Sequence, residues 1–403
     1  MKLSKLSQLL LVSSIGLLVA SLLTACQLVT IDYVYVASSA GSGSSSDGQI
    51  QTFAADSQSG ALRTISSAVS SGGVNPVAMA VSSDYTNLYV ANAADNSVVH
   101  FAISASGVLS KKDTVTLAAS PVALAVDHAG KFLYVASGTA STTLTQFPLT
   151  SGAIGSPSST IALTLAAYAT DTLVPTGVNV LASDGAVYVT AYDQSAYNPG
   201  GTTTSNAHPG WVFGFAVGSG GALTPSTASP YQAGVKPSGI ASDPTNRFVY
   251  VIDYASNQLI GYGVQSGSTL SFLINGPFNT GNQPTAIAID PRGKYMYVSN
   301  GLDSSVSAYV IDLATGSPSA AVNTTGSAIN TTDTLPVAIA IDPALGRFVY
   351  TANNLGNSIS GFRLDPNTGT LQQTQSTPYP SGFKPTALAI IPHGNHSLQA
   401  VAP

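Results

Sequence analysis

The stretch Pro284-Thr-Ala-Ile-Ala-Ile-Asp-Pro-Arg-Gly-Lys-Tyr-Met-Tyr297-Val-Ser-Asn300 decides the fold, because copies of it recur along the chain. The clearest second copy runs from Pro336 to Asn353. The opening proline recurs at Pro76, Pro121, Pro175, Pro237, Pro284, Pro336 and Pro385, and the closing tyrosine at Tyr35, Tyr89, Tyr134, Tyr188, Tyr250, Tyr297 and Tyr350. Seven copies roughly fifty residues apart predict an all-β fold, a seven-bladed β-propeller with one four-stranded blade per repeat.

Each repeat has the pattern of strands and turns. A short alanine-rich run such as Ala286–Ile289 suits the innermost strand, where the blades crowd around the axis. A turn containing proline and glycine follows, and then an apolar and aromatic strand such as Phe248–Val251. A third strand such as Ser358–Leu364 and a short outer strand complete the blade. After the first 26 residues the helical period is absent, which favours strands throughout.

The two ends of the chain predict how the ring closes. The fold begins at Tyr33-Val-Tyr-Val36, which matches the second strand of a blade, and ends with Pro385–Ile390, which matches an innermost strand. The C-terminal strand should therefore complete the N-terminal blade, which removes the open sheet edges. We expect the propeller over residues 33–391, with residues 392–403 as a spare tail.

The first residues predict export and a lipid anchor. Residues 1–26 combine a basic start with an apolar run and end in Leu23-Thr-Ala-Cys26, which resembles a bacterial lipobox with Cys26 as the lipidated residue. The alternative is an ordinary signal peptide with a chance cysteine. Gln27 in place of aspartate favours the outer membrane of the cell envelope. Residues 27–32 form only a short tether to the bottom of the ring, so the bottom face should lie toward the membrane.

Composition narrows the classes of partner. Without Lys2 and Lys5 the chain has 11 basic and 18 acidic residues, and all the acidic ones are aspartate. The sequence has no basic stripe of the kind that binds nucleic acid, so nucleic acid is not an expected partner. Cys26 is the only cysteine, so the propeller should contain no disulfide.

Several motifs resemble those of a known family. They are the Pro-x-x-Ile-Ala-Ile-Asp-Pro and Phe-Val-Tyr-Val units, Ser229-Pro-Tyr-Gln-Ala-Gly234 and Asp365-Pro-Asn-Thr-Gly-Thr-Leu371. Over residues 33–391 the chain is similar to the lactonase-like seven-bladed propellers, which include 6-phosphogluconolactonases. The resemblance implies a site of polar and charged side chains around the top of the central channel. A chain without glutamate departs from any site of that family that relies on this residue.

Oxygen-bearing side chains recur where the second strands end, on the top face. Asp253, Tyr254, Asn300 and Asn353 stand at such positions. A ring of these oxygens could hold a hard cation or hydrogen-bond a sugar or lactone. Alternatively, the side chains cap tight turns through their own backbone. No cofactor is expected from the sequence, although binding of a divalent cation at this ring of oxygens is an alternative.

One loop breaks the regularity of the repeat. Between Val189 and Trp211 the connection runs about twenty residues and contains Tyr192, Asp193, Tyr197 and His208, and loops of this length are usually functional or disordered. Its aromatic residues suit a carbohydrate or aromatic ligand, although a plain blade insertion with Trp211 packed in a strand is the alternative.

Two lysines also point to the top face. Lys236 and Lys384 each precede a repeat proline, which predicts positions on the top rim. There they could meet a phosphate or carboxylate group, or simply be solvated.

Two functions from different classes fit these features. The first is a binding or scaffold module of the cell envelope, whose top face engages a small molecule, a glycan or a protein. The second is a lactone hydrolase in which Asp193 or Asp253 activates water, His208 carries protons and a rim lysine stabilises the oxyanion. The lipid anchor, the surface rich in Ser, Thr, Gly and Asn and the absence of any known hydrolase motif make the binding module our prediction. The hydrolase is the alternative, and it rests on the family resemblance alone.

Overall fold

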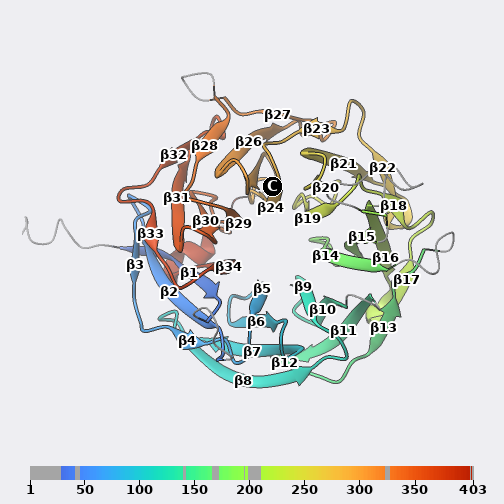
Figure 1. The fold of residues 1–403 in the computed structure, drawn as a ribbon, viewed down its shortest axis with the longest axis horizontal. Coiled ribbons are helices and arrows are strands. Elements are labelled where there is room, and N and C mark those ends of the chain that lie inside the picture. Colours follow the sequence, from blue (N-terminus) through green and yellow to red (C-terminus); the bar gives the residue numbers. More distant parts are fainter. Residues whose placement is uncertain are drawn as a thin grey trace, which may run out of the picture.

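A computed structural model describes residues 29–40, 46–138, 142–165, 172–194, 196–197, 210–322, 327–399 and 401. Seven antiparallel sheets stand around a central axis and form a closed ring, as Figure 1 shows. The predicted all-β, seven-bladed architecture is therefore confirmed. Among the described residues no helix has the length and apolar character needed to cross a bilayer.

In the first four blades the strands run from the axis outward, and where a blade has five strands the last two both pair with the third and form the outer edge together. Blade 1 contains β34 (Pro385–Pro392), β1 (Thr30–Ser38), β2 (Gln49–Asp56), β3 (Leu62–Thr64) and β4 (Val69–Ser70). Blade 2 contains β5 (Pro76–Val81), β6 (Asn87–Asn92), β7 (Ser97–Ile103) and β8 (Leu109–Thr116). Blade 3 contains β9 (Pro121–Val126), β10 (Phe132–Ser137), β11 (Thr143–Thr150), β12 (Ala153–Ile154) and β13 (Ser159–Ala162). Blade 4 contains β14 (Leu173–Val180), β15 (Ala186–Asp193), β16 (Gly210–Val217), β17 (Leu223–Pro225) and β18 (Tyr231–Gln232).

The remaining three blades repeat the pattern. Blade 5 contains β19 (Pro237–Ser242), β20 (Phe248–Asp253), β21 (Gln258–Val264), β22 (Leu270–Phe272) and β23 (Phe278–Asn279). Blade 6 contains β24 (Pro284–Ile289), β25 (Tyr295–Asn300), β26 (Ser305–Ile311), β27 (Pro318–Ala320) and β28 (Ile329–Thr331). Blade 7 contains β29 (Pro336–Ile341), β30 (Phe348–Asn353), β31 (Ser358–Leu364), β32 (Leu371–Gln373) and β33 (Tyr379–Pro380). Three short 3-10 helices lie outside the sheets: η1 (Ser219–Gly221), η2 (Ser266–Ser268) and η3 (Gly394–Leu398).

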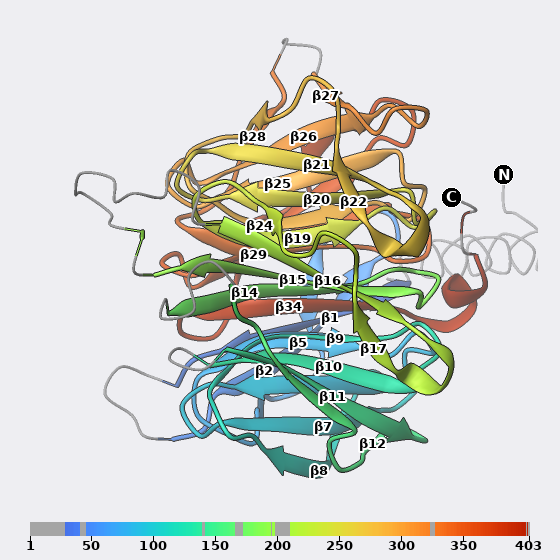
Figure 2. The same cartoon turned by 90° about the vertical axis from the view of Figure 1, so that its right-hand side faces the viewer.

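The C-terminal strand closes the ring as predicted. β34 pairs antiparallel with β1, with Tyr35 opposite Ala389, so the first blade takes its innermost strand from the end of the chain. β1 begins at Thr30, slightly before the expected start of the propeller. The residues beyond β34 are more than a spare tail. They form η3 at the bottom face, on the right of Figure 2, and the His393 amide donates to the Ile31 carbonyl at 2.7 Å.

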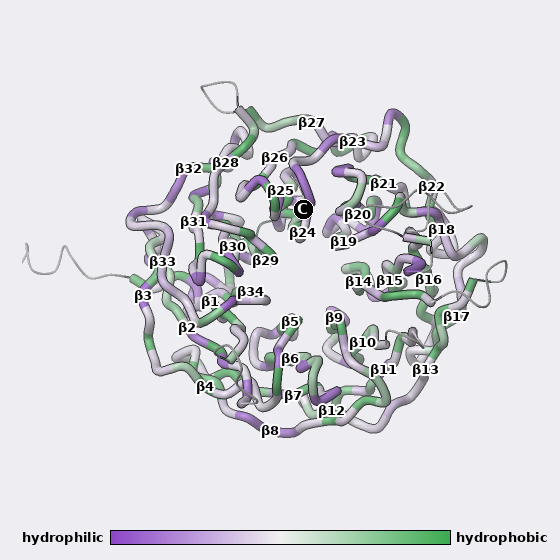
Figure 3. The backbone as a smooth tube through the Cα atoms, in the orientation of Figure 1, coloured by the Kyte–Doolittle hydropathy of each residue, from purple (hydrophilic) through white to green (hydrophobic). Residues whose placement is uncertain are grey.

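The hydrophobic core is divided among the blades. Buried apolar residues form separate clusters, and each cluster lies between two neighbouring blades. Figure 3 shows apolar residues in the strands of every blade. Burial between blades, rather than in one centre, explains why the repeat keeps the same apolar positions in each copy.

Hydrogen bonds join neighbouring blades at two depths. Near the channel, Thr285 Oγ1 donates to the carbonyl of Pro336, and Thr386 Oγ1 to that of Pro76, both at 2.7 Å. Further out, the buried repeat tyrosine reaches the next blade: Tyr297 Oη donates to the Gly369 carbonyl at 2.8 Å. These bonds hold the blades in a rigid frame, on which the top-face loops are carried.

Candidate functional site

One lysine and three tyrosines meet on the top face between blades 4 and 5. Lys236, just before β19, has its Nζ 5.3 Å from the ring centroid of Tyr192, 4.9 Å from that of Tyr197 and 4.8 Å from that of Tyr254. Tyr192 lies near the end of β15, Tyr197 just beyond it, and Tyr254 directly after β20. We call these four residues the tyrosine–lysine cluster. An ammonium group this close to aromatic faces is in the range of cation–π attraction.

Asp253 holds the lysine side of the cluster. Its carboxylate is fully buried and accepts hydrogen bonds from the backbone amides of Val235 at 2.7 Å and Lys236 at 2.9 Å. Gly234 has a φ of +72°, and a side chain there would run into the Asp253 carboxylate, so the tight loop requires glycine. The Tyr254 amide in turn donates to the Lys236 carbonyl at 2.9 Å. Asp253 thereby fixes the position of the lysine backbone.

Asp193 lies on the tyrosine side of the cluster, two residues beyond the repeat position that Asp253 has in blade 5. It is 1% exposed, its Oδ1 accepts from the Ala196 amide at 3.3 Å, and its backbone carbonyl accepts from the Tyr197 amide at 3.0 Å. This turn brings the Tyr197 ring edge-on to Tyr192, with the ring centroids 5.6 Å apart. Both aspartates that were predicted to activate water therefore also shape the loops that carry the cluster.

Burial sets the electrostatics of the cluster. It lowers the pKa of Lys236 below that of an ordinary lysine, because desolvation disfavours the charged form. It raises the pKa of Tyr192 and Tyr197, so both phenols stay protonated near neutral pH. Among the described residues no carboxylate lies within ion-pair distance of the Lys236 ammonium. The ammonium is thus available to an anionic or electron-rich ligand.

A polar cavity of about 340 Å³ adjoins the cluster. Tyr197 and Tyr254 form one wall, and Asn257, Gln283 and the exposed Leu302 line the rest. Tyr254 Oη donates to Gln283 Oε1 at 2.8 Å, which orients both groups. Aromatic faces, amide groups and one cation together suit a single polyhydroxylated ring that carries a carbonyl or an acid group.

Asn300 and Asn353, predicted as ligand-binding residues, are fully buried. Asn300 Nδ2 donates to Ser305 Oγ at 3.1 Å and to Ser307 Oγ at 2.9 Å, and Asn353 makes the same pair of bonds with Ser358 and Ser360. These contacts bind the start of the third strand to the end of the second. The Nδ2 groups thus bind serine hydroxyls of the third strand rather than the backbone of their own turns, and the ligand-binding role and the turn-capping alternative both stay predictions.

The other predicted residues do not join the cluster. Lys384 lies at the top rim but precedes β34 in blade 1, which is not adjacent to blade 5, and its Nζ is 5.5 Å from the Phe383 ring centroid. His208 and Cys26 lie outside the described residues, so their predicted roles stay predictions. Gln283 was missed, although it stands before repeat proline Pro284 as Lys236 stands before Pro237. That position marks the top rim in blades 5 and 6.

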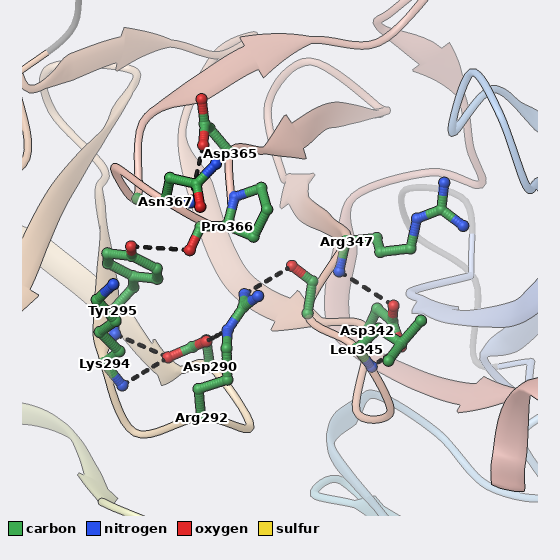
Figure 4. A network of polar contacts seen from close by, with 12 residues as sticks. Asp290, Arg292, Lys294, Tyr295, Asp342, Leu345, Arg347, Asp365, Pro366 and Asn367 are labelled. Atoms are coloured by element: carbon green, nitrogen blue, oxygen red, sulfur yellow. Dashed lines mark hydrogen bonds and ion pairs between the residues drawn. The ribbon is translucent and has the colours of Figure 1, made fainter. Parts of the chain in front are cut away.

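A second polar cavity, of about 560 Å³, lies on the bottom face between blades 6 and 7. Figure 4 shows its network, in which Arg292 Nε bonds Asp290 Oδ2 at 2.5 Å and Arg292 Nη2 donates to the Gly346 carbonyl at 3.3 Å. Arg347 and Arg363 also line this cavity, and neither guanidinium has a hydrogen-bond partner among the described residues. The cavity suits an anion, but none of the residues predicted from the irregular loop reaches it.

Comparison with known proteins agrees with this architecture. The model of the family "Lactonase, 7-bladed beta-propeller" matches residues 33–170 and 222–400. No curated protein matches the sequence significantly. Tyr192 and Tyr197 fall between the two matched segments, so one side of the cluster lies where the family model does not match.

Solved structures share the fold at low sequence identity. A candidate 6-phosphogluconolactonase of Bacteroides fragilis superposes with a TM-score of 0.70 at 19% identity, over 90% of this chain and 98% of its own. The periplasmic gluconolactonase of Pseudomonas aeruginosa gives 0.67 at 19% identity, over 90% of this chain and 99% of its own. From the family match over most of its length, we conclude that this chain is a member of the lactonase family of seven-bladed β-propellers.

Proposed function

We propose that this protein hydrolyses a sugar-derived lactone at the tyrosine–lysine cluster. The observation that carries the proposal is the half-buried Lys236 ammonium, held among three tyrosine rings beside a cavity of about 340 Å³. Family membership supports this class of substrate. The tyrosine faces suit the apolar faces of a sugar ring, and the amides of Asn257 and Gln283 suit its hydroxyl groups.

In such a reaction Lys236 acts on the carbonyl oxygen. Water adds to the lactone carbonyl carbon, the ring C–O bond breaks, and the proton of the water ends on the former ring oxygen. Negative charge gathers on the carbonyl oxygen in the transition state, and a desolvated ammonium that needs no reorganisation stabilises it. Asp253 is engaged by backbone amides, so we assign it the positioning of Lys236 rather than water activation. His208 stays the predicted proton carrier.

A second candidate function is a binding module that recognises a sugar or sugar acid without turnover. The observation that favours it is the engagement of Asp193 and Asp253 by loop backbone, because a hydrolase is expected to have a base close to the substrate.

In either case we propose that the protein is exported and anchored to the envelope through Cys26. Val29, three residues after Cys26, lies on the bottom face, where the Ser57 amide donates to its carbonyl at 2.8 Å.

The experiment is a turnover assay of the full chain against sugar lactones with and without a phosphate group, followed by calorimetry with the product acids. Lys236→Met should lower kcat by about 10²–10³-fold, the usual cost of removing an oxyanion donor. Lys384→Met is the matched control, since it removes the other rim lysine and should leave kcat unchanged. Turnover that survives in Lys236→Met contradicts the assigned role. Binding of the acids without any turnover supports the second candidate instead.

A further inference from the structure

Three ionisable side chains from distant parts of the chain meet inside the bottom face. Asp32 lies near the start of β1, Asp342 follows β29, and His396 belongs to η3 in the C-terminal tail. His396 Nε2 is 3.0 Å from Asp342 Oδ1 and 3.5 Å from Asp32 Oδ1. One ligand atom from each residue lies within 4.8 Å of the others. This spacing allows the three donors to share one metal ion.

The three residues Asp32, Asp342 and His396, which we call the Asp–His cluster, are unusual because they are buried. Both aspartates are 0% exposed and His396 is 5% exposed. Neither oxygen of the Asp32 carboxylate has a hydrogen-bond partner among the described residues, although the group faces His396. A buried carboxylate without hydrogen bonds is costly, so such groups usually pair with a cation or coordinate a metal.

The repeat shows that Asp32 is an exception to the pattern. It stands three residues before repeat tyrosine Tyr35, and the same position holds a basic residue in four other blades: Lys131, Arg247, Lys294 and Arg347. Arg347 is close enough to influence the Asp32 carboxylate, but it forms no ion pair with it. An acid thus replaces the basic residue of those four blades in blade 1, where the C-terminal tail packs against the start of β1. Protonated His396 could balance only one of the two carboxylates, whereas a divalent cation balances both.

The residues around the cluster orient its donors. His396 Nδ1 lies 3.1 Å from Gln399 Oε1, and Nε2 lies 3.0 Å from Asp342 Oδ1. With the proton on Nδ1 donated to Gln399, the Nε2 lone pair can coordinate a cation that takes the place of its contact with Asp342. Asp342 is held by the backbone amides of Ala344 at 2.9 Å and Arg347 at 3.0 Å. Outer hydrogen bonds of this kind fix the ligands of metal sites, and no other group of three such donors occurs among the described residues.

We propose that Asp32, Asp342 and His396 bind one divalent cation of the zinc or manganese type, which ties the C-terminal tail to the first and last blades. The imidazole donor and the two carboxylates favour a first-row transition ion over calcium or magnesium, which prefer an all-oxygen set. The site joins the N-terminal strand, the last blade and the tail, so its role is structural. It adds a second link where β34 already closes the ring.

The test measures cation binding by the full chain after treatment with a chelator. Calorimetry with zinc and with manganese ions, and metal analysis after dialysis, should give one equivalent per chain for at least one of the two ions. Bound cation should also protect the tail from carboxypeptidase. Changes to outer hydrogen bonds alone cost about 10–100-fold in metal affinity, so Asp32→Asn and His396→Gln should each lose about 100-fold or more.

The matched control is His393→Gln. His393 also lies in the tail, with its ring 4.7 Å from that of Tyr33, but it is not part of the cluster. It should bind the cation as the unaltered chain does. Because η3 is a peripheral element, His396→Gln tests the site even if Asp32→Asn fails to fold. The proposal is overturned if the unaltered chain binds neither ion, or if folded Asp32→Asn and His396→Gln bind as well as it does.

Discussion

The hydroxyl of Tyr350 in blade 7 donates a hydrogen bond to the backbone carbonyl of Gly60 in blade 1, at 2.7 Å. Equivalent bonds join Tyr35 to Gly107, Tyr89 to Gly152, Tyr250 to Gly316 and Tyr297 to Gly369. In each of these pairs the tyrosine of one blade reaches a turn of the next blade. The Tyr350–Gly60 bond therefore repeats this contact across the junction between the last blade and the first.

Tyr350→Phe should destabilise the closed ring. The substitution keeps the buried aromatic ring but removes the hydroxyl that donates to the Gly60 carbonyl. A buried acceptor left without a donor lowers the free energy of unfolding by about 1–3 kcal/mol. Urea unfolding followed by circular dichroism measures this change. Tyr297→Phe is the control, because Tyr297 makes the same kind of bond, to the Gly369 carbonyl, between blades 6 and 7 rather than at the junction of the last and first blades. A stability unchanged in Tyr350→Phe but reduced in Tyr297→Phe contradicts a contribution of Tyr350 to closure.

Most of the fold could be predicted because the repeat records it. Counting the repeat prolines and tyrosines gives the number of blades. The chain begins with a second strand, Tyr33-Val-Tyr-Val36, and ends with an innermost strand, Pro385–Ile390, which predicts that these two strands pair and close the ring. The partner of each tyrosine could not be predicted, because Gly107 is 72 residues from Tyr35 and Gly369 is 72 residues from Tyr297. The contact depends on how one blade rotates against the next, which no local pattern encodes.

The candidate site was predicted only in part, because the repeat marks positions along the chain but not which side chains meet. The repeat singles out Lys236 and Tyr254, and the irregular loop singles out Tyr192; the three meet because blades 4 and 5 are neighbours. Asp253 carries the same signal as Asn300 and Asn353, yet its local role is to bind loop amides. His396 gave no signal, because its partners Asp32 and Asp342 lie hundreds of residues away or in another blade.

Asp253→Asn should leave turnover nearly intact. Asparagine occupies the equivalent position in blade 6, where Asn300 Oδ1 accepts from the Gly281 amide at 3.1 Å. The amide should keep part of the hydrogen bonding to the Lys236 loop, at a cost of about 1 kcal/mol in stability. We expect kcat for lactone hydrolysis to fall by less than about tenfold, whereas loss of a general base costs about 10²–10⁴-fold. A loss in that larger range would return Asp253 to the role of base.

The orientation on the membrane can be checked with single cysteines. Val108, on a bottom-face turn, and Leu355, on a top-face loop, are 48% and 56% exposed. Cys26 is the only cysteine of the chain and is expected to be lipidated, so each new thiol reports alone. In membrane-bound protein, Val108→Cys should react with a bulky maleimide more slowly than Leu355→Cys, and detergent should remove the difference. Protection of Leu355→Cys instead reverses the proposed orientation.

Binding of sugar acids should depend on pH through Lys236. Burial lowers the pKa of its ammonium, so the positive charge is lost at a lower pH than for an ordinary lysine, whose pKa is about 10.4. Affinity for the acid should be highest below this lowered pKa and should fall as pH rises through it. Lys236→Arg should keep its charge over the whole range and move the loss of affinity to higher pH, since a guanidinium has a far higher pKa than an ammonium.

Calorimetry from neutral to alkaline pH measures this profile, and Lys384→Met should reproduce the profile of the unaltered chain. A flat profile in the unaltered chain, or full affinity in Lys236→Met, means that the acid group binds elsewhere, for which the bottom cavity lined by Arg347 and Arg363 is the next candidate.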